Sequence, residues 1–322
     1  MTLELKNIGM IKEASVKIDG LTVIAGENDT GKSTVGRTLY SLLKTIICSN
    51  SVNYGKKAIN NYKIFFKRYT MQLFEEQISK DGDIYFKYRD IDFNIKILYN
   101  NCKFFKQTNE FKDKNFRRDM PLFIESPLIW NFLPLLNAIG KVDDYSTIEE
   151  IDFAIPTFIN DLHYALTVKH KDRDDVKKIE LNINDIIGGK FKEDNSGKFV
   201  FNKNGKNIEL INTAMGIKYF AILQVLVEKN HLYNGQVLIL DEPEVHLHPK
   251  WQLEMAKIIV KLVKNGVKVL VNSHSPYMIE ALKRYSEVEE IEDKTNFYLA
   301  ENGYIKEQES LENIFEKLVL PI

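Results

Sequence analysis

The chain has 322 residues, of which 44% are hydrophobic and 28% charged, and its 44 basic and 45 acidic side chains leave a net charge of −1. This balance is typical of a globular protein with one large or two small domains, and it gives no overall attraction to nucleic acid or to an anionic membrane. The two cysteines, Cys48 and Cys102, form no CxxC pair, which argues against a disulfide framework. The N-terminus alternates apolar and charged residues, unlike a signal or transit peptide. We therefore expect a soluble, cytoplasmic protein that does not enter a membrane.

The N-terminal part of the chain predicts two half-buried strands, one fully buried strand and a helix. Residues 3–8 and 14–18 alternate apolar and polar side chains, as strands with one buried face do. Leu21–Ala25 is apolar throughout, which is typical of a strand buried on both faces. Apolar residues then recur at helical spacing over Thr34–Cys48, so Gly26–Ser33 is the loop between a buried strand and a helix.

Residues 49–118 have a different composition, rich in lysine, asparagine and aromatic residues. No linker rich in proline, glycine or serine flanks them, so we interpret them as a variable insertion on the core of a single domain spanning residues 1–322. Within the insertion, apolar residues at helical spacing predict a helix over 58–78, and alternating residues predict a hairpin formed by 84–88 and 91–98.

The rest of the chain predicts a lobe, residues 120–235, and then a return to the core, residues 236–322. An apolar stretch at the start of the lobe is interrupted by Pro121, Pro127 and Pro134, which predicts a strand followed by a helix. The other elements expected in the lobe are a helix over 147–168, a three-stranded meander over 188–211 and a helix over 216–229. The elements expected in the core are a strand over 237–240, a helix over 249–264, a strand over 267–271, a hairpin over 296–308 and a helix over 311–320.

The stretch GENDTGKS, residues 26–33, matches the phosphate-loop pattern G-x4-G-K-S between a buried strand and a helix. Backbone N–H groups of such a loop and of the following helix point at phosphates, and glycine at both ends avoids Cβ clashes. Lys32 would place its ammonium on the β- and γ-phosphates, and the Ser33 hydroxyl would bind Mg²⁺. The nucleotide contacts expected here come from Gly26, Glu27, Asn28, Asp29, Thr30, Gly31, Lys32, Ser33 and Thr34.

A second motif, VLILDEP at 237–243, places two carboxylates at the end of a buried strand. A carboxylate beside a phosphate loop can hold Mg²⁺, and we assign this role to Asp241. Glu242 can orient and deprotonate the attacking water. The alternative is an acidic turn that caps the helix starting at Pro249, but such a turn does not require this order of apolar strand, two acids and proline.

Together, GENDTGKS, LILDEPEVHLHP and LVNSHSP resemble the ATP-binding-cassette (ABC) ATPases, in particular the soluble branch that contains SMC proteins, RecF and the ATPase half of the overcoming-lysogenization-defect nucleases. The resemblance covers nearly the whole chain, with the motifs in the family's order. It implies an α/β head with a mixed phosphate-loop sheet, an N-terminal antiparallel β subdomain and a helical signature lobe. It also implies ATP and Mg²⁺ as ligands, His274 as the switch histidine on the γ-phosphate, and Glu244–His248 as a loop that crosses a dimer interface.

The family has a signature loop that clamps the γ-phosphate held by the opposite subunit, and its best match here is NTAMGIK, residues 212–218. Gly216 falls on the glycine of the motif, whereas Ala214 stands where the motif has serine. The missing hydroxyl removes one hydrogen bond to the phosphate, while backbone N–H groups and the helix dipole remain and Lys218 could compensate. We expect Asn212, Ala214, Gly216 and Lys218 to face the partner's nucleotide, and hydrolysis to be slow.

The glutamine that usually links Mg²⁺ to the helical lobe has no unique counterpart in this sequence. Gln72 and Gln77 fall in the insertion and Gln107 in a basic loop, while Glu125 at a strand end offers another polar group. All four stay open as candidates.

The leading functional hypothesis is an ATPase that forms a head-to-tail homodimer around ATP and releases it on hydrolysis. We expect no second catalytic domain, so the resemblance implies a regulatory subunit for a separately encoded effector, as in bacterial anti-phage or toxin–antitoxin systems. One alternative is a RecF-like DNA-binding repair ATPase that uses the basic, aromatic segments 56–69 and 103–118, although their acidic neighbours and the net charge argue against it. The other is a nucleotide-sensing scaffold with little turnover.

Overall fold

The computed structural model describes residues 1–52, 69, 81–88, 91–98, 101–107, 120–139, 155–170, 179–194 and 198–319. Most of the helix predicted over 58–78 and most of the two basic, aromatic segments lie outside these residues. The first part of the helix predicted over 147–168 also lies outside them.

Eight helices and fourteen strands are described in this part of the chain. The helices are α1 (Lys32–Val52), α3 (Ile129–Ile139), α5 (Thr157–Thr167), α6 (Ile183–Ile187), α7 (Met215–Glu228), α8 (Pro249–Lys264), α9 (Pro276–Val288) and α10 (Glu312–Val319). The first seven strands are β1 (Thr2–Ile8), β2 (Ile11–Lys17), β3 (Leu21–Ala25), β4 (Asp81–Tyr88), β5 (Ile91–Leu98), β6 (Asn101–Gln107) and β7 (Leu122–Ile124). The others are β8 (Lys190–Glu193), β9 (Phe199–Lys203), β10 (Lys206–Glu209), β11 (Val237–Asp241), β12 (Lys268–Ser273), β13 (Thr295–Glu301) and β14 (Tyr304–Gln308).

One large mixed sheet joins the N-terminal strands to the phosphate-loop core, in the order β6-β5-β4-β1-β2-β14-β13-β3-β12-β11-β7. The strands from β13 to β7 run parallel to one another, whereas β2, β1, β4, β5 and β6 pair antiparallel. The expected mixed core and antiparallel β subdomain are therefore confirmed, and they are continuous. Strands β4–β6, which lie within residues 49–118, extend this sheet from β1.

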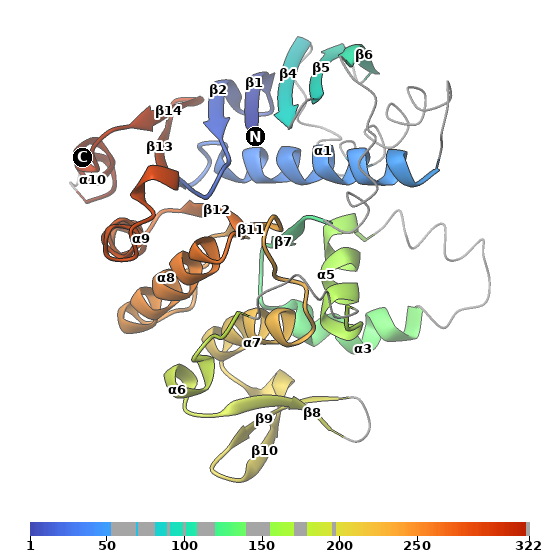
Figure 1. Ribbon diagram of the computed structural model, residues 1–322, viewed down its shortest axis with the longest axis vertical. Helices are drawn as coiled ribbons and strands as arrows, with labels where there is room; N and C mark the ends of the chain where they lie inside the picture. The colour runs from blue at the N-terminus through green and yellow to red at the C-terminus, as the bar shows by residue number, and fades with distance from the viewer. Residues whose placement is uncertain are drawn as a thin grey trace.

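Alternating side chains of the central strands separate two apolar cores. On β11, Leu238 and Leu240 belong to the core on the lobe side, whereas Val237 and Ile239 belong to the core around α1. This is the period-two alternation of a strand buried on both faces. Figure 1 shows α1 on one side of the central strands, beneath β1, β2 and β4, and α3, α5 and α7 on the other side.

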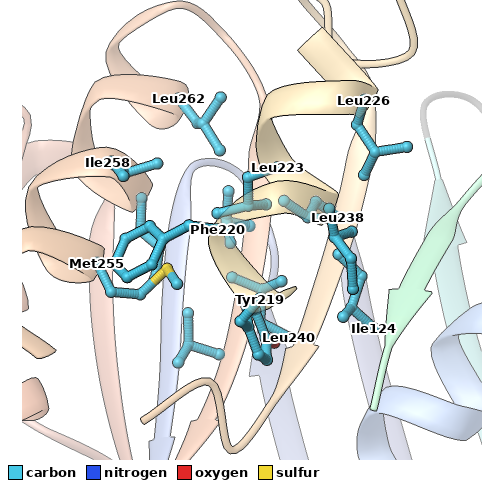
Figure 2. Packing of buried hydrophobic residues seen from close by; sticks show 14 of the residues in the cluster. Ile124, Tyr219, Phe220, Leu223, Leu226, Leu238, Leu240, Met255, Ile258 and Leu262 are labelled. Atoms are coloured by element: carbon cyan, nitrogen blue, oxygen red, sulfur yellow. The ribbon is translucent and has the colours of Figure 1, made fainter. Parts of the chain in front are cut away.

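Helix α7 is the centre of the lobe core. Figure 2 shows Phe220 and Leu223 of α7 lying between the strand residues Leu238 and Leu240 and the α8 residue Met255. A helix that is apolar over most of its circumference must be covered on several sides, and α7 is covered by the sheet, α8 and α6. Its first turn is thereby held close to the ends of the central strands. A separate antiparallel sheet, β10-β9-β8, lies at the end of the lobe in Figure 1.

Most predicted elements are confirmed, including the first three strands, the hairpin β4–β5, the meander β8–β10 and the closing hairpin β13–β14. Helices α6 and α9 are additional to the predicted elements. Pro134, expected to interrupt the apolar stretch, lies inside α3 because Trp130, Leu133 and Leu136 pack that helix into the lobe core. Within the described part of the chain, no helix has both the length and the apolar character to cross a membrane.

Candidate functional site

The candidate site lies where three parallel strands of the large sheet end. Strands β3, β12 and β11 are neighbours, so their carboxyl ends meet at one edge. The phosphate loop follows β3, Glu242 follows β11 and His274 follows β12. This edge is where open parallel sheets bind ligands, because the loops leaving neighbouring strands can converge there.

The glycines at the two ends of the phosphate loop have neighbours so close that a larger residue would clash with them. A Cβ at Gly26 would lie 2.5 Å from the carbonyl oxygen of Ala300. A Cβ at Gly31, whose φ is +91°, would lie 2.8 Å from Ile11 Cγ1. The backbone between them therefore follows a path that larger residues would block, and it delivers the chain to the first turn of α1.

Lys32 is the first residue of α1 and its ammonium folds back over the loop. It donates hydrogen bonds to the carbonyl oxygens of Gly26, at 2.9 Å, and Glu27, at 2.5 Å. Burial lowers the pKa of Lys32, and nearby carboxylates, first Glu242 and then Asp241, oppose that shift. The ammonium thus lies at the centre of the loop, while the side chains of Glu27, Asn28 and Asp29 are exposed.

Ser33 and Asp241, far apart in sequence, meet at the strand ends. The Ser33 hydroxyl donates to Asp241 Oδ1 at 3.1 Å, and Asn272 Nδ2 donates to the same oxygen at 2.7 Å. Burial raises the pKa of Asp241, while the hydrogen bonds from Asn272 and Ser33 lower it. A hydroxyl and a carboxylate oxygen are ligands that suit Mg²⁺. No cluster of three or more His, Cys, Asp or Glu ligands occurs among the described residues, so any Mg²⁺ here would need further oxygens from a nucleotide and water.

Glu242 has a strained backbone at the start of the loop after β11. Its φ is +49°, a left-handed conformation that costs a residue with a Cβ about 1–3 kcal/mol and that gathers at functional sites. The Glu242 N–H donates to the Asn272 carbonyl oxygen at 2.9 Å, which holds the strained residue in place. Its side chain stays 32% exposed, and Glu242 Oε1 lies 3.3 Å from His274 Nδ1.

Glu244 was not predicted to act inside the subunit, yet it organises the backbone around His274. Its side chain is 3% exposed, and Oε1 accepts hydrogen bonds from Ser273 Oγ at 2.7 Å, His274 N at 2.9 Å and Ser275 N at 3.2 Å. Its partners lie 29 to 31 residues further along the chain, so no local sequence pattern indicated this role. In the loop assigned to a dimer interface, Val245, His246 and His248 are exposed as expected, whereas Glu244 and Leu247 point inward.

A small cavity of about 170 Å³ opens beside the carboxylates that follow the apolar run of β11. It is lined by Asp241 and Glu242, by Glu125 and Ser126 after β7, and by Tyr219 of α7. Because β7 pairs with β11, Glu125 leaves the sheet next to Asp241, where it forms an ion pair with Arg37 of α1. Of the four open candidates for the link to the lobe, Glu125 lies beside Asp241 and Gln107 ends β6 at the far edge of the sheet. Gln72 and Gln77 lie outside the described residues.

The structure corrects the role expected for Lys218 in the signature loop. Lys218 is 2% exposed, and its ammonium donates to Asn131 Oδ1 at 2.9 Å and to the Ile211 carbonyl oxygen at 3.1 Å. Because these two acceptors hold the ammonium inside the lobe, Lys218 does not face outward from the signature loop as expected.

The other signature residues are divided between packing and exposure. A Cβ on Gly216 would lie 2.9 Å from Leu247 Cδ2 and 3.1 Å from two carbons of Trp251, so this glycine seats α7 on the loop before α8. Asn212 and Ala214 are exposed. Ala214 occupies the N-cap position of α7, where no side chain caps the helix. What the loop presents outward is therefore mainly the backbone N–H groups of the first turn of α7.

Buried polar atoms without hydrogen-bond partners gather around this edge. Among the described residues they include Tyr219 Oη, Glu244 Oε2, Asn272 Oδ1 and His274 Nδ1. Unpartnered buried groups are rare in folded proteins and are often found where a ligand or a conformational change completes the structure. Their position marks the same edge of the sheet as the sequence motifs do.

The fold agrees with that of solved Smc head domains. The Smc head domain of Pyrococcus furiosus, solved with the C-terminal domain of ScpA, superposes with a TM-score of 0.51 and 14% identity over 98% of this chain and 97% of that one. A second Smc head, bound to the C-winged helix domain of ScpA, gives a TM-score of 0.53 and 16% identity over 97% and 98% of the two chains. At such identities the similarity shows the fold alone.

The chain belongs to the family described as "AAA domain, putative AbiEii toxin, Type IV TA system", whose model matches residues 21–280. A shorter similarity links it to the Septu protein PtuA of Bacillus thuringiensis, with 39% identity over 49 residues. That match spans 15% of this chain and 12% of the Septu protein, so it covers only a small part of the relative's length.

Proposed function

We propose that this protein binds ATP with Mg²⁺ at the edge formed by β3, β11 and β12 and hydrolyses it slowly. The observation that carries the proposal is the convergence of Ser33, Asp241 and His274 with Lys32 and Glu242, from three separate segments of the chain. The phosphate-loop ATPase fold and the family membership support ATP as the ligand.

Each residue of the site has a distinct role in this proposal. The first N–H groups of α1 and the Lys32 ammonium bind the phosphates, for which Lys32 gives up its two carbonyl partners. Ser33 and Asp241 would hold Mg²⁺, which would neutralise phosphate charge. Glu242 accepts a proton from the attacking water, and its partly exposed carboxylate lies beside His274. His274 lies beside Glu242 and donates to the γ-phosphate.

We further propose that two copies associate head to tail when ATP is bound. The signature loop carries exposed backbone donors at the start of α7 but no nucleotide-binding side chain of its own, so it supports a contact with phosphate held by the partner copy. With Lys218 turned inward and no serine at position 214, this contact is weak, which favours slow turnover.

The biological role we propose is that of a cytoplasmic regulatory ATPase for a separately encoded effector in anti-phage defence or toxin–antitoxin control. The support is the family description and the short similarity to the Septu protein. The effector would bind either the ATP-bound dimer or the released monomer, so that hydrolysis sets how long it is active.

The decisive experiment compares wild type with Glu242→Gln. Because general-base catalysis contributes about 10²–10⁴-fold, we expect kcat for phosphate release to fall by at least about 100-fold while ATP binding persists. With ATP, the variant should show a dimer mass by light scattering. Glu309→Gln, at an exposed position, is the matched control and should behave as wild type. Equal phosphate release by wild type and Glu242→Gln would contradict the proposed site, and an ATP-independent mass would contradict the dimer.

A further inference from the structure

Glu244 uses only one of its two carboxylate oxygens. Oε1 accepts three hydrogen bonds from the segment Ser273–Ser275, whereas Oε2 is buried and makes none. A carboxylate can accept at both oxygens, so a buried free oxygen carries a desolvation cost. This cost is unexplained if Glu244 only holds the backbone next to His274.

Tyr219 presents the complementary unpartnered group. Its side chain is 1% exposed, its hydroxyl makes no hydrogen bond, and it lines the cavity beside Asp241 and Glu242. The same cavity is lined by Glu242, Val245 and His246, so Tyr219 lies against the loop that carries Glu244. Burial raises the pKa of Tyr219 well above its ordinary value, and the charges of Asp241 and Glu244 add to that shift. A phenylalanine would fill the same space without burying an unpartnered hydroxyl, so packing alone does not explain a tyrosine here.

The position of Tyr219 connects this hydroxyl to the signature loop. Tyr219 lies in the first turns of α7, three residues after Gly216, which packs directly against Leu247 and Trp251. The first turn of α7 therefore packs directly against the loop that carries Glu244. Among the described residues, this places a free donor and a free acceptor on two elements in contact, so a small shift of α7 changes their separation.

We propose that Tyr219 and Glu244 are a positioning pair for His274, in which the Tyr219 hydroxyl donates to Glu244 Oε2 when the signature loop of the same subunit seats on the partner's nucleotide. The two atoms do not hydrogen-bond in this structure, so the pair forms through a small shift of α7 or through one bridging water. With both oxygens engaged, Glu244 fixes the backbone at Ser273–Ser275, and with it the imidazole of His274. The inference rests on the proposed function, since the dimer and the role of His274 belong to it.

The consequence is a connection between the two nucleotides of the dimer. Contact between the start of α7 and the partner's ATP brings Tyr219 into its hydrogen bond with Glu244. Glu244 then fixes His274 in the site of the same subunit. Each subunit would then complete its catalytic edge only when its partner is loaded. Such coupling acts on the catalytic step and leaves ATP binding by a single subunit unchanged.

The test is Tyr219→Phe, which removes only the hydroxyl. We expect kcat to fall about tenfold or more, because a hydrogen bond to a charged group is lost in the active dimer. KM for ATP, the ATP-dependent dimer mass and Tm should not fall. Tyr298→Phe is the matched control: that buried hydroxyl accepts from Lys17 N at 3.0 Å, so its removal should lower Tm and leave kcat unchanged. Unchanged kcat in Tyr219→Phe, or a loss of kcat that accompanies a loss of Tm, overturns the inference.

The double variant with Glu244→Gln tests whether the two residues act together. Glutamine keeps an acceptor for Ser273 and His274 but places an amide N–H₂ where Tyr219 would donate. If the pair acts as a unit, adding Tyr219→Phe to Glu244→Gln lowers kcat no further, whereas multiplicative losses overturn the pairing. If wild type hydrolyses ATP and Tyr219→Phe has the same kcat, only this inference is contradicted. If wild type does not hydrolyse ATP, the proposed function is contradicted as well.

Discussion

The edge formed by β3, β11 and β12 and the loop at the start of α7 are the two regions of the proposed ATP site, and the chain builds them in opposite ways. At the edge, side chains from three strand ends converge, as in the hydrogen bonds of Ser33 and Asn272 to Asp241. At the signature loop, the functional group is a short stretch of backbone, and its side chains are either exposed or turned inward. In the proposed dimer, the first region is completed within one chain, whereas the second acts on the nucleotide of the partner copy.

Two buried lysines give the sharpest form of this comparison. Lys32 is held only by carbonyl oxygens of the phosphate loop, which a nucleotide can replace, whereas Lys218 is held inside the lobe by Asn131 and Ile211. We expect Lys32→Met to weaken ATP binding by at least about 100-fold, since charge-assisted contacts with phosphate are lost. Lys218→Met should keep ATP binding and lower the free energy of unfolding by about 1–2 kcal/mol, because it leaves its acceptors unpaired.

The comparison is contradicted if Lys218→Met loses ATP binding while Lys32→Met keeps it and loses only stability. Titration with a fluorescent ATP analogue and thermal unfolding of the nucleotide-free proteins measure the two effects separately. Lys250→Met, at an exposed position of α8, is a control for the loss of one positive charge and should change neither quantity. Normal ATP affinity of Lys32→Met would contradict the assignment of the phosphate loop itself.

Replacing Asp241 should have opposite effects on the stability of the protein and on its nucleotide binding, and the stability effect is smaller than those of the lysine variants. Burial raises the pKa of this carboxyl above 3.8, so its contribution to the free energy of unfolding is most favourable at low pH and is lost as pH rises through the folded pKa. At neutral pH the buried charge therefore costs stability. We expect Asp241→Asn to stabilise the nucleotide-free protein by about 1 kcal/mol at pH 7 and to abolish Mg²⁺-dependent nucleotide binding.

Thermal unfolding between pH 4.5 and 7.5 would measure this difference, which should shrink as the pH falls toward the acid end. Asp293→Asn, at an exposed position, should show no such trend. Lower stability of Asp241→Asn at pH 7 would mean that the hydrogen bonds from Asn272 and Ser33 outweigh the cost of burial.

The same contrast explains what could be predicted from sequence. The buried strands, the phosphate loop and the acids after β11 have strong local patterns, because strand periodicity and loop chemistry are properties of consecutive residues. The contacts of Glu244 with Ser273–Ser275 and the inward turn of Lys218 depend on tertiary packing, which no local pattern encodes. Helix α9 did carry a local signal, since Ser275 caps it and Pro276 begins it, but those residues also belong to the motif around His274.

The smallest predicted effect tests the weaker region directly, by restoring the serine that the signature motif usually has. Ala214 is the N-cap of α7 and is exposed, with extended backbone dihedrals suited to a capping side chain. In Ala214→Ser the hydroxyl can accept from a free N–H of the first turn, which should raise the free energy of unfolding by about 0.5–1 kcal/mol. If the loop also meets the partner's phosphate, kcat should rise as well, because the hydroxyl adds a donor there. Ala214→Val, which lacks the hydroxyl and caps a helix no better than alanine does, is the control for both readouts. A higher Tm without faster phosphate release would limit position 214 to capping, and only the backbone of α7 would then remain to complete the partner's site.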